Sequence, residues 1–268
     1  MDQYRLQAVV DANYPAGVKR AIEGLAIFRE DFMYFRDQGL GVNTIDLINT
    51  NKTKETKSKF CATYPQSYDI IDPYTKKQIS VTIGYSLAQM LVAHCSNSIS
   101  YPIAGFKHNM IIKDAIYGTL SFTPTICPDP IGNQKEILED MRVNYASYID
   151  NQLVIESLYT SQEKLSQWSN ITNVMSIQEV VKAIRIRCPA VRYTFIEGED
   201  LERYRADVEE VIAPFRSNFK SLELEYVEDN TYSVSKIFYA ALKVVYRDFI
   251  QTEWFKVTAL ADVEVLTS

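Results

Sequence analysis

The sequence is poor in the residues from which catalytic and cofactor sites are usually built. Its 268 residues include only 9 glycines, 2 histidines and 4 cysteines. It contains no nucleotide-binding GxGxxG or GxxxxGK[ST] loop, no GxSxG nucleophile motif and no HExxH zinc motif. These absences argue against nucleotide-dependent, serine-hydrolase and zinc-protease chemistry. We therefore expect a protein that is not an enzyme and that holds no cofactor or metal.

The few candidate catalytic residues each have a structural explanation. His94 lies on a helical apolar stripe, which favours packing over a role as a base, and His108 falls in an expected surface loop. Cys188 has Arg185 and Arg187 close by in sequence, which would lower a thiol pKa. Yet Cys188 also completes an apolar stripe that favours core packing. An enzyme with an unrecognised site, using Cys188 or His94, is kept as one hypothesis.

Charge, hydropathy and cysteine spacing exclude further classes. The net charge of −6, with no clustered basic face, gives no support for nucleic-acid binding. No apolar run approaches the roughly 18 residues of a membrane helix, so we expect no membrane insertion. The four cysteines form no CxxC pair, which predicts reduced thiols of a cytosolic protein and neither a metal site nor a disulfide framework: Cys61, Cys95, Cys127 and Cys188.

Hydrophobic periodicity predicts strands and helices that alternate along the chain. A strand at 9–10 leads into a helix that begins near Pro15 and stops at Gly39. A strand, a turn and a strand are expected within 68–86, followed by a helix over 86–97. The stretch 118–132 is expected to hold an edge-like strand and a proline-punctuated loop.

The second half of the chain continues the same alternation. A helical segment from 133 is expected to lead to a turn at Asp150-Asn151 and a strand over 152–160. Two amphipathic helices, near 174–188 and 200–215, precede a strand at 221–227. The predicted fold class is α/β (mixed α+β), with a mixed sheet flanked by amphipathic helices.

The last thirty residues carry two runs of alternating apolar side chains. The first run covers 239–247 and the second 253–265, and this period of two predicts β-strands. The loop 249–252 would allow 237–248 and 253–264 to form a hairpin within one subunit. Alternatively, the last strand is an arm that pairs with a neighbouring subunit. Both arrangements stay open at this point.

Two regions are expected from composition and element order. Residues 1–165 would form a core of strand and helix units, and 166–268 a C-terminal domain with the terminal strand. The lysine-rich stretch "NTNKTKETKSK" predicts a solvated loop that protrudes at about 49–60.

Several short motifs follow one another along the chain. The first is "DANYPAGVKRAIEGLAIFREDFMYFRD", with Asp11, Arg29, Asp31 and Asp37 at the motif positions. "ATYPQSYDIIDP" and "YPIAG" follow, then Asn144 and Thr160 in "RVNYASYIDNQLVIESLYTS". "YTFIEGEDL" and "YRDFIQTEWFKV", with Glu253 as the acidic position, complete the series. In this order the motifs resemble those of the tail sheath proteins of contractile-tailed bacteriophages and contractile injection systems.

The chain also departs from the sheath pattern. The family's Tyr-Tyr-Pro-Trp is reduced to Tyr64-Pro65, and Asp248 or a neighbour replaces its closing proline. Sheath proteins are typically longer, with an N-terminal arm and early strands that have no counterpart here. The resemblance therefore points to a compact or split sheath, or to the sheath core alone.

The resemblance implies a structural virion protein without enzymatic activity. Such a subunit polymerises helically around an inner tail tube and contracts to drive the tube through the host envelope. Its partners would be further copies of itself, the inner tail tube protein, and the baseplate and tail terminator proteins. It would reside in the virion tail after assembly in the host cytoplasm. The alternative is another virion component: a tail tube, baseplate or capsid lattice protein.

In sheath proteins the chain termini act as arms that add strands to sheets of neighbouring subunits. The resemblance thus implies an inter-subunit strand in the last part of this chain. The residues assigned to that strand are Trp254, Phe255, Lys256, Val257, Thr258, Ala259 and Leu260.

Overall fold

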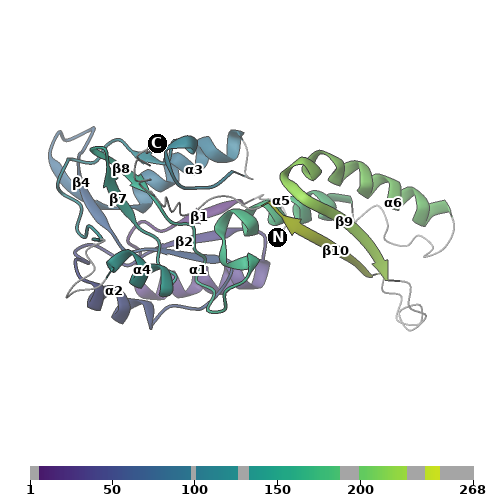
Figure 1. The fold of residues 1–268 in the computed structure, drawn as a ribbon, viewed down its shortest axis with the longest axis horizontal. Helices are drawn as coiled ribbons and strands as arrows, with labels where there is room; N and C mark the ends of the chain where they lie inside the picture. The colour runs from purple at the N-terminus through teal and green to yellow at the C-terminus, as the bar shows by residue number, and fades with distance from the viewer. Residues whose placement is uncertain (1–5, 98–100, 126–132, 188–198, 228–238, 248–268) are drawn as a thin grey trace, which may run out of the picture.

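The computed structural model describes residues 6–97, 101–125, 133–187, 199–227 and 239–247. Figure 1 shows a larger lobe and a smaller lobe, with helix α5 (Ile171–Arg187) reaching from the first into the second. Helices and several small sheets are mixed along the chain, so the predicted α+β class is confirmed. No helix of the described residues is long and apolar enough to cross a lipid bilayer.

A three-stranded parallel sheet forms the centre of the larger lobe. Its strands are β1 (Ala8–Val10), β2 (Met33–Asp37) and β3 (Cys61–Tyr64), in the order β1-β2-β3. Helix α1 (Ala16–Arg29) connects β1 to β2, and α2 (Ile45–Lys52) belongs to the connection from β2 to β3. Strand β2 is buried on both faces, which is why its first three residues, Met33, Tyr34 and Phe35, are apolar without alternation.

The predicted helix from Pro15 to Gly39 is wrong in its second half. Helix α1 ends at Arg29, and Glu30 caps it in a left-handed conformation (φ 59°) with its N–H bonded to Ala26 O. Phe32 and Phe35, assigned to the helix from their spacing, lie in or next to β2 and are fully buried. A short apolar run of this kind fits a doubly buried strand as well as a helix, and the neighbouring strands decide between them.

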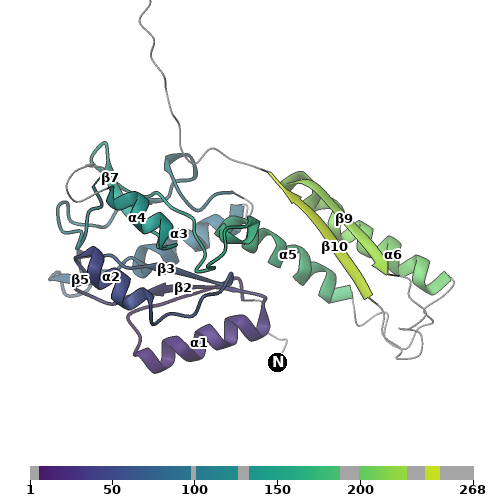
Figure 2. The same ribbon diagram turned by 60° about the horizontal axis from the view of Figure 1, so that its bottom comes forward.

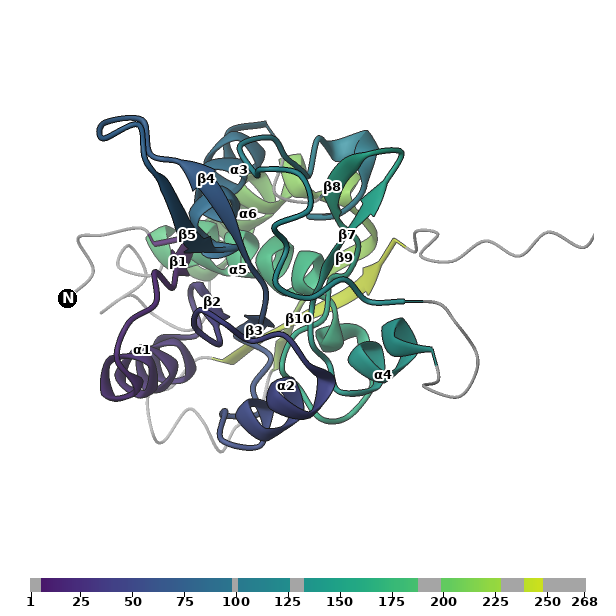
Figure 3. The ribbon, with the colours of Figure 1, turned by 90° about the vertical axis from the view of Figure 1, so that its left-hand side faces the viewer.

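Helices α1 and α3 (Gly84–Asn97) cover opposite faces of this sheet (Figures 1 and 2). The predicted strand, turn and strand before α3 are confirmed as β4 (Ser67–Ile71) and β5 (Gln78–Thr82), an antiparallel hairpin that projects from the lobe in Figure 3.

The edge-like strand predicted within 118–132 is not present in the described residues of that stretch, 118–125. This segment follows the edge of β4, where Ser121 N donates to Ser67 O. Two of its hydroxyls replace backbone carbonyls as acceptors: Thr119 Oγ1 from Asp69 N, and Ser121 Oγ from Ser67 N. Side-chain bonds therefore satisfy the edge without a regular ladder.

A second three-stranded sheet completes the larger lobe. It has the order β6-β8-β7, from β6 (Ile111–Ile112), β7 (Ala146–Ile149) and β8 (Gln152–Ile155), and α4 (Gln134–Asp140) precedes β7. The predicted turn at Asp150-Asn151 is confirmed. Both residues have positive φ (49° and 62°), as a two-residue hairpin turn requires.

The smaller lobe is a β-hairpin covered by helices. Strands β9 (Phe219–Val227) and β10 (Tyr239–Tyr246) pair antiparallel, and α6 (Glu199–Ile212) packs on their apolar face together with the end of α5. Its core is a separate hydrophobic cluster, and Trp168 packs against both this cluster and the main core. The strand and the two amphipathic helices predicted here are confirmed.

Candidate functional site

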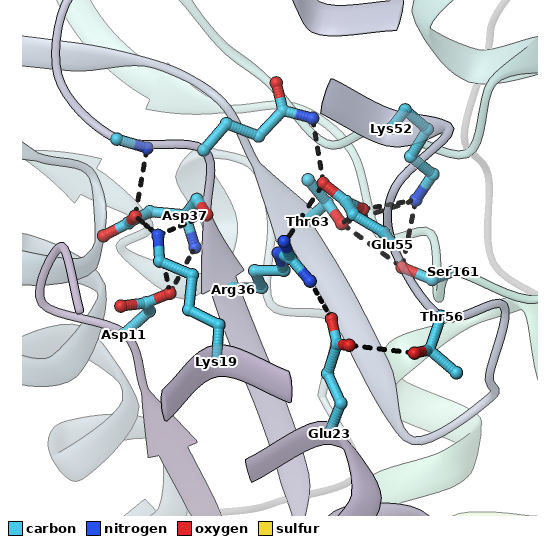
Figure 4. A network of polar contacts seen from close by, with 12 residues as sticks. Asp11, Lys19, Glu23, Arg36, Asp37, Lys52, Glu55, Thr56, Thr63 and Ser161 are labelled. Atoms are coloured by element: carbon cyan, nitrogen blue, oxygen red, sulfur yellow. Dashed lines mark hydrogen bonds and ion pairs between the residues drawn. The ribbon is translucent and has the colours of Figure 1, made fainter. Parts of the chain in front are cut away.

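A buried network of charged residues lies beside the carboxyl ends of β1 and β2 (Figure 4). Asp11 follows β1, Asp37 ends β2, and Lys19 reaches both from α1. Lys19 Nζ lies 3.0 Å from Asp11 Oδ2 and 2.9 Å from the Asp37 carbonyl oxygen, and it also contacts the Asp37 carboxylate. The three side chains are 8%, 0% and 2% exposed, so water hardly screens these contacts.

Both carboxylates also accept hydrogen bonds from the loops around them. Asp37 accepts from Asn13 N (2.7 Å), Gly39 N (3.1 Å) and Thr82 Oγ1 (2.9 Å). Asp11 accepts from Tyr14 N (2.9 Å) and from the Tyr34 hydroxyl (2.9 Å), and burial together with this carboxylate raises the pKa of Tyr34. These bonds fix the loops that follow β1 and β2.

A second half of the network joins α1 to β2 and the segment after α2. Arg36 contacts Glu23, and its Nε lies 3.8 Å from Glu55 Oε1. Burial alone would lower the pKa of Arg36, but Glu55 and Glu23 outweigh it and raise that pKa. Gln38 Nε2 donates to Glu55 Oε1 at 2.9 Å, and Thr63 also contacts Glu55.

Lys52 extends the network to a distant part of the chain. Its Nζ lies 3.2 Å from Glu55 Oε2 and donates to Ser161 Oγ (3.0 Å) and to Arg142 O (3.3 Å). Burial lowers the pKa of Lys52, and the Glu55 carboxylate only partly opposes that shift. The α2 region is thereby tied to segments about a hundred residues later.

The prediction of a solvated loop protruding at 49–60 is therefore wrong for much of that segment. Residues 49–52 are the last turn of α2, Glu55 is buried, and Thr56 Oγ1 donates to Glu23 Oε2 at 2.9 Å. The exposed residues of this segment are Asn49, Thr50, Thr53, Lys54, Thr56 and Lys57. The lysine-rich composition of the segment does not reveal that Lys52 and Glu55 have buried partners.

The network is arranged to hold structure together. Each carboxylate already has a cation or hydrogen-bond donors, and the groups are closed off from solvent, which leaves no acid or base for a substrate. Burial raises the pKa of the Cys61 thiol to about 12, so this thiol is unreactive at neutral pH. Among the described residues, no three His, Cys, Asp or Glu side chains are grouped to hold a metal ion.

The residues named at the sequence level are only partly brought together. Asp11 and Asp37 meet in the network, whereas Arg29 and Asp31 form a separate pair with 2.7 Å between Nη2 and Oδ2. The hydrogen bond from Arg29 holds the pKa of Asp31 below its usual value.

The candidate catalytic residues lie apart from the network. His94 is buried in α3, and His108 stacks on Tyr101 with 5.1 Å between ring centres. Burial and Lys107 lower the pKa of His108. Cys188 and the strand Trp254–Leu260 lie outside the described residues.

Sequence reasoning missed the cations and glutamates of the network. Lys19 and Glu23 were not singled out because charged helix residues usually face water. The apolar pattern gave no signal for their burial, since Val18 and Leu25 form a stripe that would normally face the core in place of Lys19 and Glu23.

The β9–β10 sheet offers a second candidate site, for binding another strand. Among the described residues no third strand pairs with it, so each strand has one open edge. Its outward face carries Glu225 and Lys243, 2.8 Å apart between Oε2 and Nζ, and the hydrogen bond from Lys243 raises the pKa of that lysine. Open edges of this kind accept an added strand.

Comparison with known proteins finds relatives by structure alone. No protein-family model matches the chain, and no curated protein matches it by sequence. A chain in the baseplate of the anti-feeding prophage matches with a TM-score of 0.72 and 10% identity, over 95% of this chain and 69% of that one.

Sheath structures match as well, with TM-scores from 0.71 down to 0.54. A chain of the sheath complex of an extracellular contractile injection system, in its contracted state, gives a TM-score of 0.71 at 12% identity, over 96% of this chain and 71% of that one. The sheath tail protein from Desulfitobacterium hafniense gives a TM-score of 0.54 at 8% identity, over 92% of this chain and 57% of that one. The chain thus spans about 70% of the length of the first of these proteins. This chain has the fold found in the sheath proteins of contractile injection systems and phage-like tails.

Proposed function

We propose that this chain is a contractile tail sheath subunit, a structural protein without enzymatic activity. The observation that carries the proposal is the fold match over more than nine-tenths of the chain to sheath proteins. The buried network supports it as well, because saturated charges stiffen a body and offer no catalytic group. Many copies would form a helical lattice around an inner tube, and contraction would drive the tube through an envelope.

Strand exchange between copies is the proposed link of this lattice. Residues Trp254–Leu260 of one copy would add to an open edge of the β9–β10 sheet of a neighbour. Their alternating apolar pattern and their position soon after β10 support this assignment. Backbone hydrogen bonds would supply affinity, and the alternate side chains would fix the register.

The division into 1–165 and 166–268 fits this role. The small-lobe cluster supports it, because it contains no residue before Trp168, while Ile171, Val174 and Met175 at the start of α5 belong to the main core. The large lobe would move as a rigid body while the small lobe keeps its strand links. Such rigid-body motion is a known form of switching.

The further partners follow from the same proposal. They are the inner tail tube protein, the baseplate and the tail terminator, and the location is the virion tail. A second candidate role is a baseplate component, which the match to a chain in the anti-feeding prophage baseplate favours.

Electron microscopy of the purified, concentrated protein tests the proposal. A sheath subunit should form tubes or long polysheath, and a variant truncated before Leu260 should stay folded without polymerising. The substitutions Val257→Pro and Ala259→Pro should have the same effect, since each bars a pairing strand. The exposed Lys54→Glu serves as the control. Proline variants that still pellet as tubes would rule out this strand as the link.

A further inference from the structure

Helix α1 is partly inverted: it buries two charged side chains and exposes large apolar ones, while Ile22 and Ala26 pack against the main core. Its buried residues are Lys19, Glu23 and Ala26, and the first two belong to the charge network. On the outer side, Val18 and Leu25 are each 44% exposed and Phe28 is 84% exposed. A surface helix normally shows the reverse pattern.

The exposed side chains form one continuous seam. Positions 18, 21, 25 and 28 of the helix are occupied by Val, Ala, Leu and Phe, with the alternating steps of three and four that helix pairs use. Gly17 and Gly24 lie beside the seam, and no heavy atom stands within 4 Å of a Cβ built on either. An opposing helix can therefore approach closely.

Helix α3 supplies a matching face on the other side of the sheet. Its sequence, GYSLAQMLVAHCSN, has no Asp, Glu, Lys or Arg. Tyr85, Gln89 and Val92 are exposed at the spacing of one helix face, and Val92 is 71% exposed. An uncharged helix face can cover the α1 seam without burying a charge.

We propose that the α1 seam of one copy packs against the outer face of α3 in the next copy. This contact rests on the proposed function and adds a second link to the lattice. Because α1 and α3 lie on opposite faces of one sheet (Figure 2), they cannot meet within a copy. The contact is heterologous, and a repeated heterologous contact stacks copies without closing into a dimer.

The physical reason for a second contact lies in the lattice. Strand addition along one direction produces a chain or a ring, and a tube wall needs an independent contact in another direction. The α1–α3 contact provides a direction that runs through the central sheet, roughly from one of its faces to the other.

Crosslinking in assembled protein tests the contact. Cys95, Cys127 and Cys188 are first replaced by Ala, and buried Cys61 stays. Leu25→Cys and Val92→Cys are then introduced together or singly, and assemblies are treated with a short bismaleimide. We expect a ladder of oligomers from the double variant on a denaturing gel, dimers only from an equal mixture of the single variants, and no product from either single variant alone.

Charge substitutions supply a second measurement. Leu25→Lys and Val92→Glu should each raise the concentration needed for assembly by about tenfold or more, equivalent to about 1.4 kcal/mol per contact. Combining them should return that concentration to near the wild-type value, because the new charges face each other. Leu165→Lys, at a residue 75% exposed on neither helix, is the matched control and should change little.

The possible failures are distinguishable. Crosslinking of Leu25→Cys alone would show that α1 meets α1 and would overturn the contact. Tubes of the double cysteine variant that give no crosslink between positions 25 and 92 would also overturn the contact, while the proposed function stands. A wild-type protein that never assembles would overturn the proposed function itself.

Discussion

Replacing Lys19 by Met should destabilise the subunit far more than removal of any surface lysine. Methionine keeps most of the apolar stem but leaves Asp11 and Asp37 buried together without their cation. Removing one partner of a buried ion pair costs about 3–5 kcal/mol, and here two carboxylates lose it. That is a large part of the roughly 5–15 kcal/mol that stabilises an ordinary domain.

The exposed pair of Lys57 and Glu163 is a matched control. Its Nζ and Oε1 lie 2.6 Å apart, but the side chains are 63% and 69% exposed. Lys57→Met should therefore cost less than about 1 kcal/mol. Urea unfolding followed by circular dichroism, at concentrations where the protein is monomeric, measures both variants. If Lys19→Met and Lys57→Met lower the free energy of unfolding equally, burial does not make the contacts of Lys19 with Asp11 and Asp37 strong, and the reasoning is refuted.

Three further predictions concern the backbone and pH. Gly84→Ala should destabilise the subunit by about 3 kcal/mol, because the new Cβ would lie 2.2 Å from the backbone oxygen of Asp11. Gly24→Ala should instead stabilise it by about 0.5–1 kcal/mol, because Gly24 lies in a helix with open space around its Cβ position. Thermal unfolding compares the two variants. Asn151→Ala should cost about 1 kcal/mol in the same assay, since φ is 62° there and alanine tolerates that conformation poorly. The Cys61 pKa rises from 9.0 to about 12 on folding, so the unfolded chain loses this proton first, and stability should fall with rising pH across that window by about 1.4 kcal/mol per unit. Cys61→Ala should lack this part of the slope in urea titrations at pH 9 to 11, and parallel curves would contradict the assignment.

The sequence by itself determined the elements whose signals are local. Alternation over 239–246 predicted β10, the apolar stripes predicted α5 and α6, and Asp150-Asn151 predicted the hairpin turn. These features follow from periodicity and turn chemistry within a few residues. The segments resembling sheath proteins likewise led to the fold that the structural matches show.

Tertiary structure alone decided which charges are buried and which strands pair. Residues 33–37 form a strand because β1 and β3 lie on either side of β2. Strand β10 pairs with β9, and the alternation within β10 does not specify that partner. Lys52 is held by Ser161, 109 residues away, so its own lysine-rich neighbourhood could only suggest a solvated loop. Burial of a charge depends on partners brought together by the fold, and short-range periodicity carries no record of them.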